Sequence, residues 1–168
     1  MELIKLFLLG ATGYLLAGLY DVAILLDKPL LRRFLYAGFF ITALPYPVIF
    51  FTWVSPLPSF VAWIIFPLAT AFALLLVYSV MIETALFSDS TGKLYRGGTY
   101  RISRHPGFIW YTIINVLVSI YYWNYRITML FMGLTLCNLI LIAVEDRIFF
   151  PKMFAEYKEY RKSTPFIL

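Results

Sequence analysis

The feature that most limits the fold is a run of 49 consecutive residues, from Phe34 to Ile82, that contains no charged side chain. A helix that crosses the hydrocarbon core of a bilayer needs about 20 apolar residues. The run therefore has room for two membrane-crossing helices and the turn between them. The apolar blocks are too long and unbroken for the strands of a membrane barrel, which alternate over about 10 residues. The sequence predicts an all-α membrane protein.

The hydropathy pattern predicts about five membrane-crossing helices in one membrane domain that covers residues 1–168. A three-span bundle is expected over 1–87, and the second half, 88–168, is expected to hold a polar loop, a helical hairpin and a tail helix over about 151–162. Pro45 and Pro47 remove two backbone donors and should kink the second helix. The expected membrane-crossing segments are 6–26, 34–54, 60–87, 107–123 and 127–144. The first is expected to be a retained helix and not a cleaved signal peptide.

Basic residues predict the orientation. Twelve of the 14 Lys and Arg residues lie in three segments, 28–33, 93–104 and 147–162, and five spans place all three segments on one side. The positive-inside tendency then puts the N-terminus outside and the C-terminus in the cytoplasm. The tail helix is expected to lie on lipid as an amphipathic helix, to cover a cytoplasmic pocket, or to do both.

Several functional classes are disfavoured. The net charge of +5 comes from short loops between spans, so it indicates topology and lipid headgroups and gives no signal for nucleic acid. Cys137 is the only cysteine and His105 the only histidine, so no internal disulfide can form and no metal site is expected. The chain shows no phosphate-binding loop and no dinucleotide fingerprint.

The polar residues that could carry chemistry are few. Glu145 and Asp146 are adjacent, so on a helix they point about 100° apart and cannot form a paired dyad; they could bind a polyol or a cation. His105 stands at a membrane edge, where an interfacial role is more common than a catalytic one. Asp21 is expected to reach water at the end of its helix, and Glu83 is left open between that role and a functional one.

Taken together, the second half of the chain, residues 97–168, resembles the superfamily of isoprenylcysteine carboxyl methyltransferases and phospholipid methyltransferases. These integral membrane enzymes use S-adenosylmethionine. The similarity lies in the order and spacing of several short motifs: Gly98-Thr99-Tyr100-Arg101, Arg104-His105-Pro106, a hydrophobic hairpin, Glu145-Asp146, and a tail that runs from Phe154 to Arg161 and on to Pro165.

The resemblance implies a composite site on the cytoplasmic face. Tyr100, His105 and Pro106 would shape one wall, and Tyr157, Tyr160 and Arg161 would close the site. The implied cofactor-binding residues are Tyr100, Arg104, His105, Pro106, Phe108, Glu145, Asp146 and Tyr157. The implied catalytic residues are Glu145 and Arg161. The acceptor would be a lipophilic molecule that enters from the bilayer, such as a phospholipid amine or a prenyl carboxylate or thiol.

The chain departs from the family pattern at four positions. Thr99 replaces a proline, Asp146 a glutamate, Phe108 a tyrosine and Trp110 a glycine. The last two changes motivate an alternative, in which the protein is a degenerate relative that binds a lipid or a partner membrane protein without chemistry. A reductase is a third possibility, because sterol reductases share the architecture, but the chain is short and a second nucleotide-binding motif is not visible.

Overall fold

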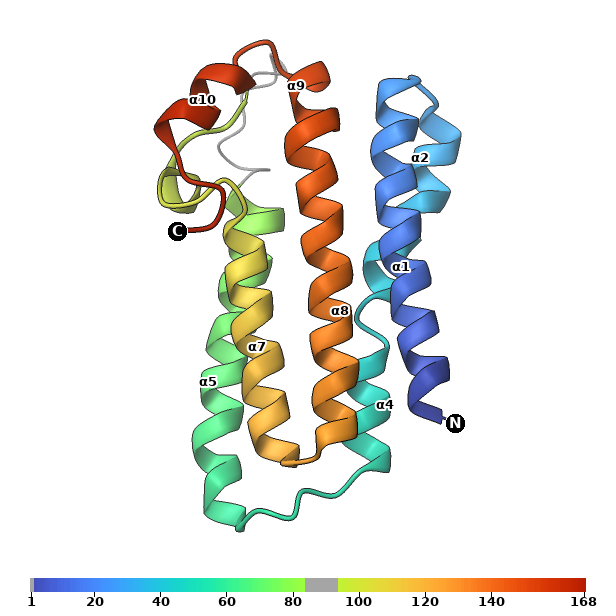
Figure 1. Cartoon of the computed structure of the whole chain (residues 1–168), viewed down its shortest axis with the longest axis vertical. Coiled ribbons are helices and arrows are strands. Elements are labelled where there is room, and N and C mark those ends of the chain that lie inside the picture. The colour runs from blue at the N-terminus through green and yellow to red at the C-terminus, as the bar shows by residue number, and fades with distance from the viewer. Residues whose placement is uncertain (1, 84–93) are drawn as a thin grey trace.

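The computed structural model describes residues 2–83 and 94–168, and these residues form helices and connecting segments without a strand. Four helical stretches are long and apolar enough to cross a membrane (Figure 1): Glu2–Leu25, Pro29–Thr52, Ser59–Glu83 and Tyr125–Met153. The helix Pro106–Tyr122 is also apolar but shorter. The expected all-α class is confirmed for these residues, with four helical stretches that could cross a membrane.

The first two stretches pack closely. α1 (Glu2–Leu25) lies against a stretch that is broken into α2 (Pro29–Leu35), α3 (Ala37–Ile41) and α4 (Pro45–Thr52). A Cβ added to Gly13 of α1 would lie 2.9 Å from the carbonyl oxygen of Gly38 in α3. The missing side chains thus let the two backbones approach.

Two details of this region differ from the prediction. Arg32 and Arg33 were expected in a loop, but they form the last turn of α2, where cations are favourable because helix carbonyls are exposed there. The expected kink is a break between α3 and α4: Pro45 begins α4, where its missing backbone donor leaves no hydrogen bond unmade.

The third stretch begins with α5 (Ser59–Val77), which contains Pro67. It ends in a π-helical turn, η1 (Tyr78–Glu83). The last four residues of the predicted third span, and residues 88–93 of the polar loop, lie outside the described residues.

The hairpin of α7 (Pro106–Tyr122) and α8 (Tyr125–Val144) matches its prediction within two residues at each end. The side chain of Asn124 accepts a hydrogen bond from the Arg126 amide at 3.0 Å, which caps α8. α8 is central, with α7 on one side and α1 on the other (Figure 1). Its residues Ile127, Phe131 and Leu134 are completely buried.

A buried polar network joins three helices inside the bundle. Asn115 of α7 donates to the hydroxyl of Thr135 in α8 at 2.7 Å, and the hydroxyl of Tyr46 in α4 donates to the side-chain oxygen of Asn115. Asn115 is fully buried. An amide without partners would be costly there, so the network specifies how α4, α7 and α8 meet.

The chain after α8 does not form the single helix predicted over 151–162, and that prediction is wrong. α8 runs into a π-helical turn, η3 (Glu145–Phe149), then α9 (Phe150–Met153) and α10 (Tyr157–Ser163). The backbone is extended at Phe154. This break turns α10 toward the segment that precedes α7 (Figure 1), and Tyr157 and Tyr160 of α10 are buried.

Candidate functional site

The centre of the candidate site is the carboxylate of Asp146, which is 2% exposed. The Nη1 of Arg104 lies 3.2 Å from Oδ1 of Asp146 and the Nε2 of His105 lies 3.6 Å from it. The hydroxyl of Tyr157 donates a hydrogen bond to the same oxygen. The Nε of Arg161 is 3.7 Å from Oδ2. One side chain therefore connects the segment before α7, the turn η3 and the helix α10.

Burial sets the protonation of the groups around Asp146. Burial lowers the pKa of His105 to about 4, although the Asp146 carboxylate acts in the opposite direction. The imidazole is therefore neutral at neutral pH. Burial also raises the pKa of the Tyr157 hydroxyl, so this group keeps the proton that it donates to Asp146.

Aromatic rings enclose His105. Its ring stacks on Phe150 with a centroid distance of 5.9 Å and meets the edge of Phe166 at 5.0 Å. The guanidinium of Arg104 lies 5.6 Å above the Phe166 ring. A cation over an aromatic face is favourable, so Phe166 stabilises both polar residues from the end of the chain.

The C-terminal residues are also held by the backbone before α7. The amide of Arg104 donates to the carbonyl of Pro165 at 3.0 Å, and the hydroxyl of Ser103 donates to the carbonyl of Phe166 at 3.2 Å. The hydroxyl of Tyr160 donates to the carbonyl of Tyr100 at 2.6 Å. These three hydrogen bonds join segments that are separated by about 60 residues in sequence.

Glu83, left open by the sequence, is completely buried and organises the turn η2 (Gly98–Arg101). The Thr99 amide donates to its Oε1 at 2.9 Å, the Thr99 hydroxyl to its Oε2, and the Tyr95 hydroxyl to its Oε1 at 3.2 Å. Gly98 has a φ of +43°, and a Cβ there would lie 1.5 Å from Oε1. Glycine is required at this position.

Glu145 is the neighbour of Asp146 in η3, and adjacent helical residues point about 100° apart. The turn η3 that carries Glu145 packs against α1, the helix that carries Asp21. Asp21 is 8% exposed, so the expectation that it reaches water is wrong. Its position was readable from sequence: Gly10, Gly13, Ala17 and Asp21 are the successive buried residues of one face of α1, at the spacing of a packed helix.

The remaining predicted residues lie at the start of α7. Pro106 is fully buried in the first turn, and Phe108 is partly buried. Trp110 stacks on Phe72 of α5 with a centroid distance of 6.0 Å. A Cβ at Gly107 would lie 2.5 Å from Val80, so α7 approaches η1 closely here.

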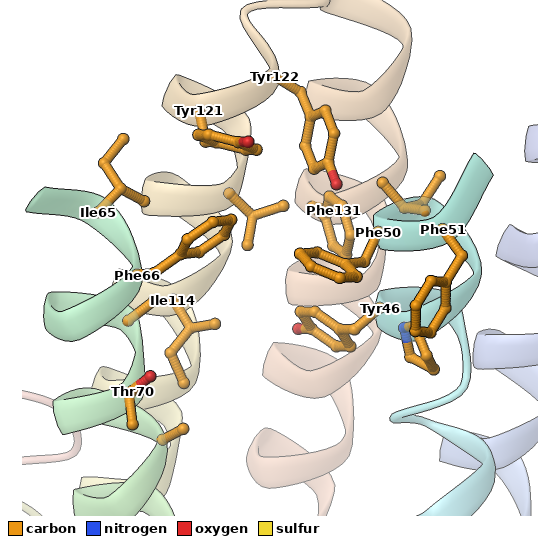
Figure 2. A pocket seen from close by; sticks show the side chains of 15 residues that line it. Tyr46, Phe50, Phe51, Ile65, Phe66, Thr70, Ile114, Tyr121, Tyr122 and Phe131 are labelled. Carbon is orange, nitrogen blue, oxygen red and sulfur yellow. The ribbon is translucent and has the colours of Figure 1, made fainter. Parts of the chain in front are cut away.

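A second feature is an apolar groove of about 430 Å³ in the half of the bundle near the α7–α8 turn (Figure 2). It lies between α4, α5, α7 and α8. Its walls are mostly aromatic and aliphatic, with Phe50 and Phe131 on one side and Phe66, Ile114 and Tyr121 on the other. Such a lining suits hydrocarbon and offers few partners to a polar ligand.

Within residues 2–83 and 94–168, no group of three or more His, Cys, Asp or Glu side chains is arranged to hold a metal ion. No protein-family model, no curated protein and no solved structure matches the chain.

Proposed function

We propose that the protein is an integral membrane methyltransferase that uses S-adenosylmethionine and acts on a lipophilic acceptor. The observation that carries the proposal is the convergence around Asp146. Arg104, His105, Tyr157 and Arg161 come from motifs up to 57 positions apart, and each lies within 3.7 Å of that carboxylate. Burying charges in an apolar chain is costly unless they are paired, and such clusters are concentrated at functional sites.

The residues divide into two roles. Asp146 is enclosed by protein groups, so we assign it to holding the site together. Among the described residues Glu145 forms no ion pair with Lys or Arg, so its carboxyl can receive ribose hydroxyls or a positive charge. The side chain of Arg161 is 49% exposed and can contact a ligand carboxylate.

Methyl transfer of this kind needs little general acid–base catalysis from the protein. The cofactor, when bound, supplies a sulfonium methyl group that is already electrophilic. The protein's task is to hold donor and acceptor in line and to exclude water. Orientation of this kind can lower a barrier by about 7–11 kcal/mol. An amine acceptor must also be neutral, and Glu145 is the nearby group that could take its proton.

The apolar groove supports a lipophilic acceptor. α7 begins at the site with Pro106 and reaches the groove at Ile114. Eight residues of helix span about 12 Å, so an acceptor with its polar end at the site would place its hydrocarbon at the depth of the groove.

We further propose that α7 is a fifth membrane-crossing helix. Its 17 residues are at the short end of the range of about 17–25 that crosses a bilayer. Five crossings place the N-terminus outside and the site on the cytoplasmic face with most of the Lys and Arg residues.

A ligand-dependent shift of the melting temperature of the detergent-solubilised protein tests the proposal. S-adenosylhomocysteine should raise the melting temperature because it binds only the folded state. Glu145→Gln and Arg161→Ala should each reduce the shift, whereas Glu2→Gln, an exposed change near the other end of α1, should not. A wild-type protein that shows no shift at millimolar S-adenosylhomocysteine contradicts the proposal.

One observation favours a second candidate. Trp110 fills the space between α7 and α5 against Phe72, where the family pattern has glycine. A degenerate relative that binds lipid without chemistry accommodates this change. Transfer of a labelled methyl group into a membrane-lipid extract would exclude it.

A further inference from the structure

Glu83 is the last residue of the π-helical turn η1, which continues α5. Single π-helical turns are frequent at functional sites. The Glu83 side chain is completely buried, and among the described residues it forms no ion pair with Lys or Arg. Burying a carboxylate is costly unless protein hydrogen bonds replace those of water. Its neutral donors therefore bind it tightly, and they all belong to the chain before α7.

Both carboxylate oxygens of Glu83 are used by this one segment. Thr99 supplies two donors, its amide to Oε1 at 2.9 Å and its hydroxyl to Oε2, and the Tyr95 hydroxyl supplies a third. The segment can approach so closely because residue 98 is glycine, where a Cβ would lie 1.5 Å from Oε1. The backbone and the side chain of Thr99 are thus both held, which sets the position of the next residue, Tyr100.

The same segment holds α10. The carbonyl of Tyr100 accepts a hydrogen bond from the hydroxyl of Tyr160 at 2.6 Å, and Tyr160 is 2% exposed. The Nη2 of Arg96 donates to the carbonyl of Glu156, the residue before α10, at 2.9 Å. The Arg96 guanidinium also lies 5.8 Å from the centre of the Tyr160 ring. The chain that Glu83 fixes therefore contacts both the start and the middle of α10.

We propose that Glu83 is a positioning residue of the cofactor site: it fixes η2, and through the carbonyl of Tyr100 it holds α10 in place. This inference rests on the proposed function, in which Tyr100 forms one wall of the site and α10 contributes Tyr157 and Arg161. A loop that is ordered before the ligand arrives does not have to be ordered at the expense of binding. Glu83 thus favours cofactor binding, whereas the groove, whose lining on α5 ends at Ala73, does not depend on it.

Limited tryptic cleavage tests the position of α10 without a ligand. Glu83→Ala removes the acceptor of all three donors and should raise the rate of cleavage after Lys158 in α10 about tenfold or more, as expected for hydrogen bonds to a charged group. Cleavage after Arg32 and Arg33 in α2, on the other side of the bundle (Figure 1), should change by less than about threefold. Cleavage of α10 at the wild-type rate would overturn the inference.

A second substitution gives the same test if Glu83→Ala does not fold. Thr99→Val keeps the carboxylate and two of its three donors, and should raise cleavage in α10 by about threefold or more. Thr99→Ser keeps the hydroxyl and should behave as the wild type. A Thr99→Val protein with the wild-type cleavage rate would count against the inference as directly as Glu83→Ala.

The route through Tyr100 is tested by Tyr160→Phe, which removes the hydroxyl and keeps the ring. If Thr99 acts on α10 through this hydrogen bond, Thr99→Val should raise cleavage less in the Tyr160→Phe background than in the wild type. The same increase in both backgrounds would overturn this route.

Steady-state kinetics with a membrane-lipid extract as acceptor separates positioning from a general loss of structure. Glu83→Ala, or Thr99→Val in its place, should raise the KM for S-adenosylmethionine by about threefold to tenfold and should change the KM for the lipid by less than about threefold. A general structural role would raise both KM values alike and would speed cleavage in α2 as much as in α10, and either result would overturn the inference.

The cleavage assay also separates this inference from the proposed function. Cleavage that behaves as expected in a protein that S-adenosylmethionine and S-adenosylhomocysteine do not stabilise refutes the proposed function and supports the placement of α10 by Glu83. Wild-type cleavage of both variants, in a protein that does bind these ligands, refutes the positioning role alone.

Discussion

Replacement of Asp146 by asparagine should release the C-terminal tail. The side chain of Arg104 is 7% exposed, so Asp146→Asn leaves its guanidinium buried without the anion 3.2 Å away. Breaking a buried ion pair from one side costs about 3–5 kcal/mol. The contact with Arg161 adds at most about 1 kcal/mol, because that side chain is half exposed and water screens it.

The loss should be seen as local opening of α10. A decrease of about 3 kcal/mol in the free energy of opening raises the open population about 100-fold. Lys158, Arg161 and Lys162 lie in α10, so the rate of limited tryptic cleavage there measures the population. The matched control is Glu156→Gln, whose ion pair with Arg96 is exposed and contributes at most about 1 kcal/mol. Cleavage of Asp146→Asn at the wild-type rate would refute the assignment of Asp146 as the centre of the site.

Three further predictions concern pH, packing and the groove. Burial lowers the pKa of His105 to about 4, so between about pH 6.5 and 4 the unfolded chain binds a proton that the folded site does not bind. The melting temperature should therefore fall as the pH is lowered through this range, and it should fall less in His105→Gln. Parallel curves of melting temperature against pH for the two proteins would contradict this. Asn115→Ala removes the hydrogen bonds that link α4, α7 and α8, and it should lower the free energy of unfolding by about 1–2 kcal/mol, measured by thermal melting in detergent. Thr12 forms a hydrogen bond only within its own helix, so Thr12→Ala should be near neutral. Ala73→Phe should fill part of the groove and raise the KM for the acceptor with little change in kcat. Ala71 is exposed, so Ala71→Phe should leave KM and kcat unchanged. Equal effects of the two substitutions would argue against the groove as the acceptor site.

The local parts of the fold could be predicted because they depend on local chemistry. Helix boundaries around Asn124 follow from a polar cap between two apolar runs, and the break before Pro45 follows from the missing backbone donor. The sequence also predicts that the site combines two distant segments. A helical hairpin that returns to its starting side brings the segment around His105 next to the start of the tail.

The rest depends on tertiary contacts that the sequence does not encode locally. The tail has the periodicity of one helix, but the helix is interrupted at Phe154. Burial of Tyr157 and Tyr160 is more favourable than the backbone hydrogen bonds of the helical turn that is lost. The partner of His105 is Asp146 and not the neighbouring Glu145, since adjacent helical residues point about 100° apart and only one of the two faces His105. The sequence predicts water for Asp21 because this residue stands near the end of its helix, whereas the packing of α1 against its neighbours buries it.

The most direct test of the central claim is transfer of a labelled methyl group from S-adenosylmethionine to a membrane-lipid extract by the purified protein. The proposed function predicts label in the lipid phase with the wild type and a loss of about tenfold or more with Glu145→Gln, the size expected when a hydrogen bond to a charged group is removed. No label in any lipid fraction, from a protein that does bind the cofactor, would contradict the claim.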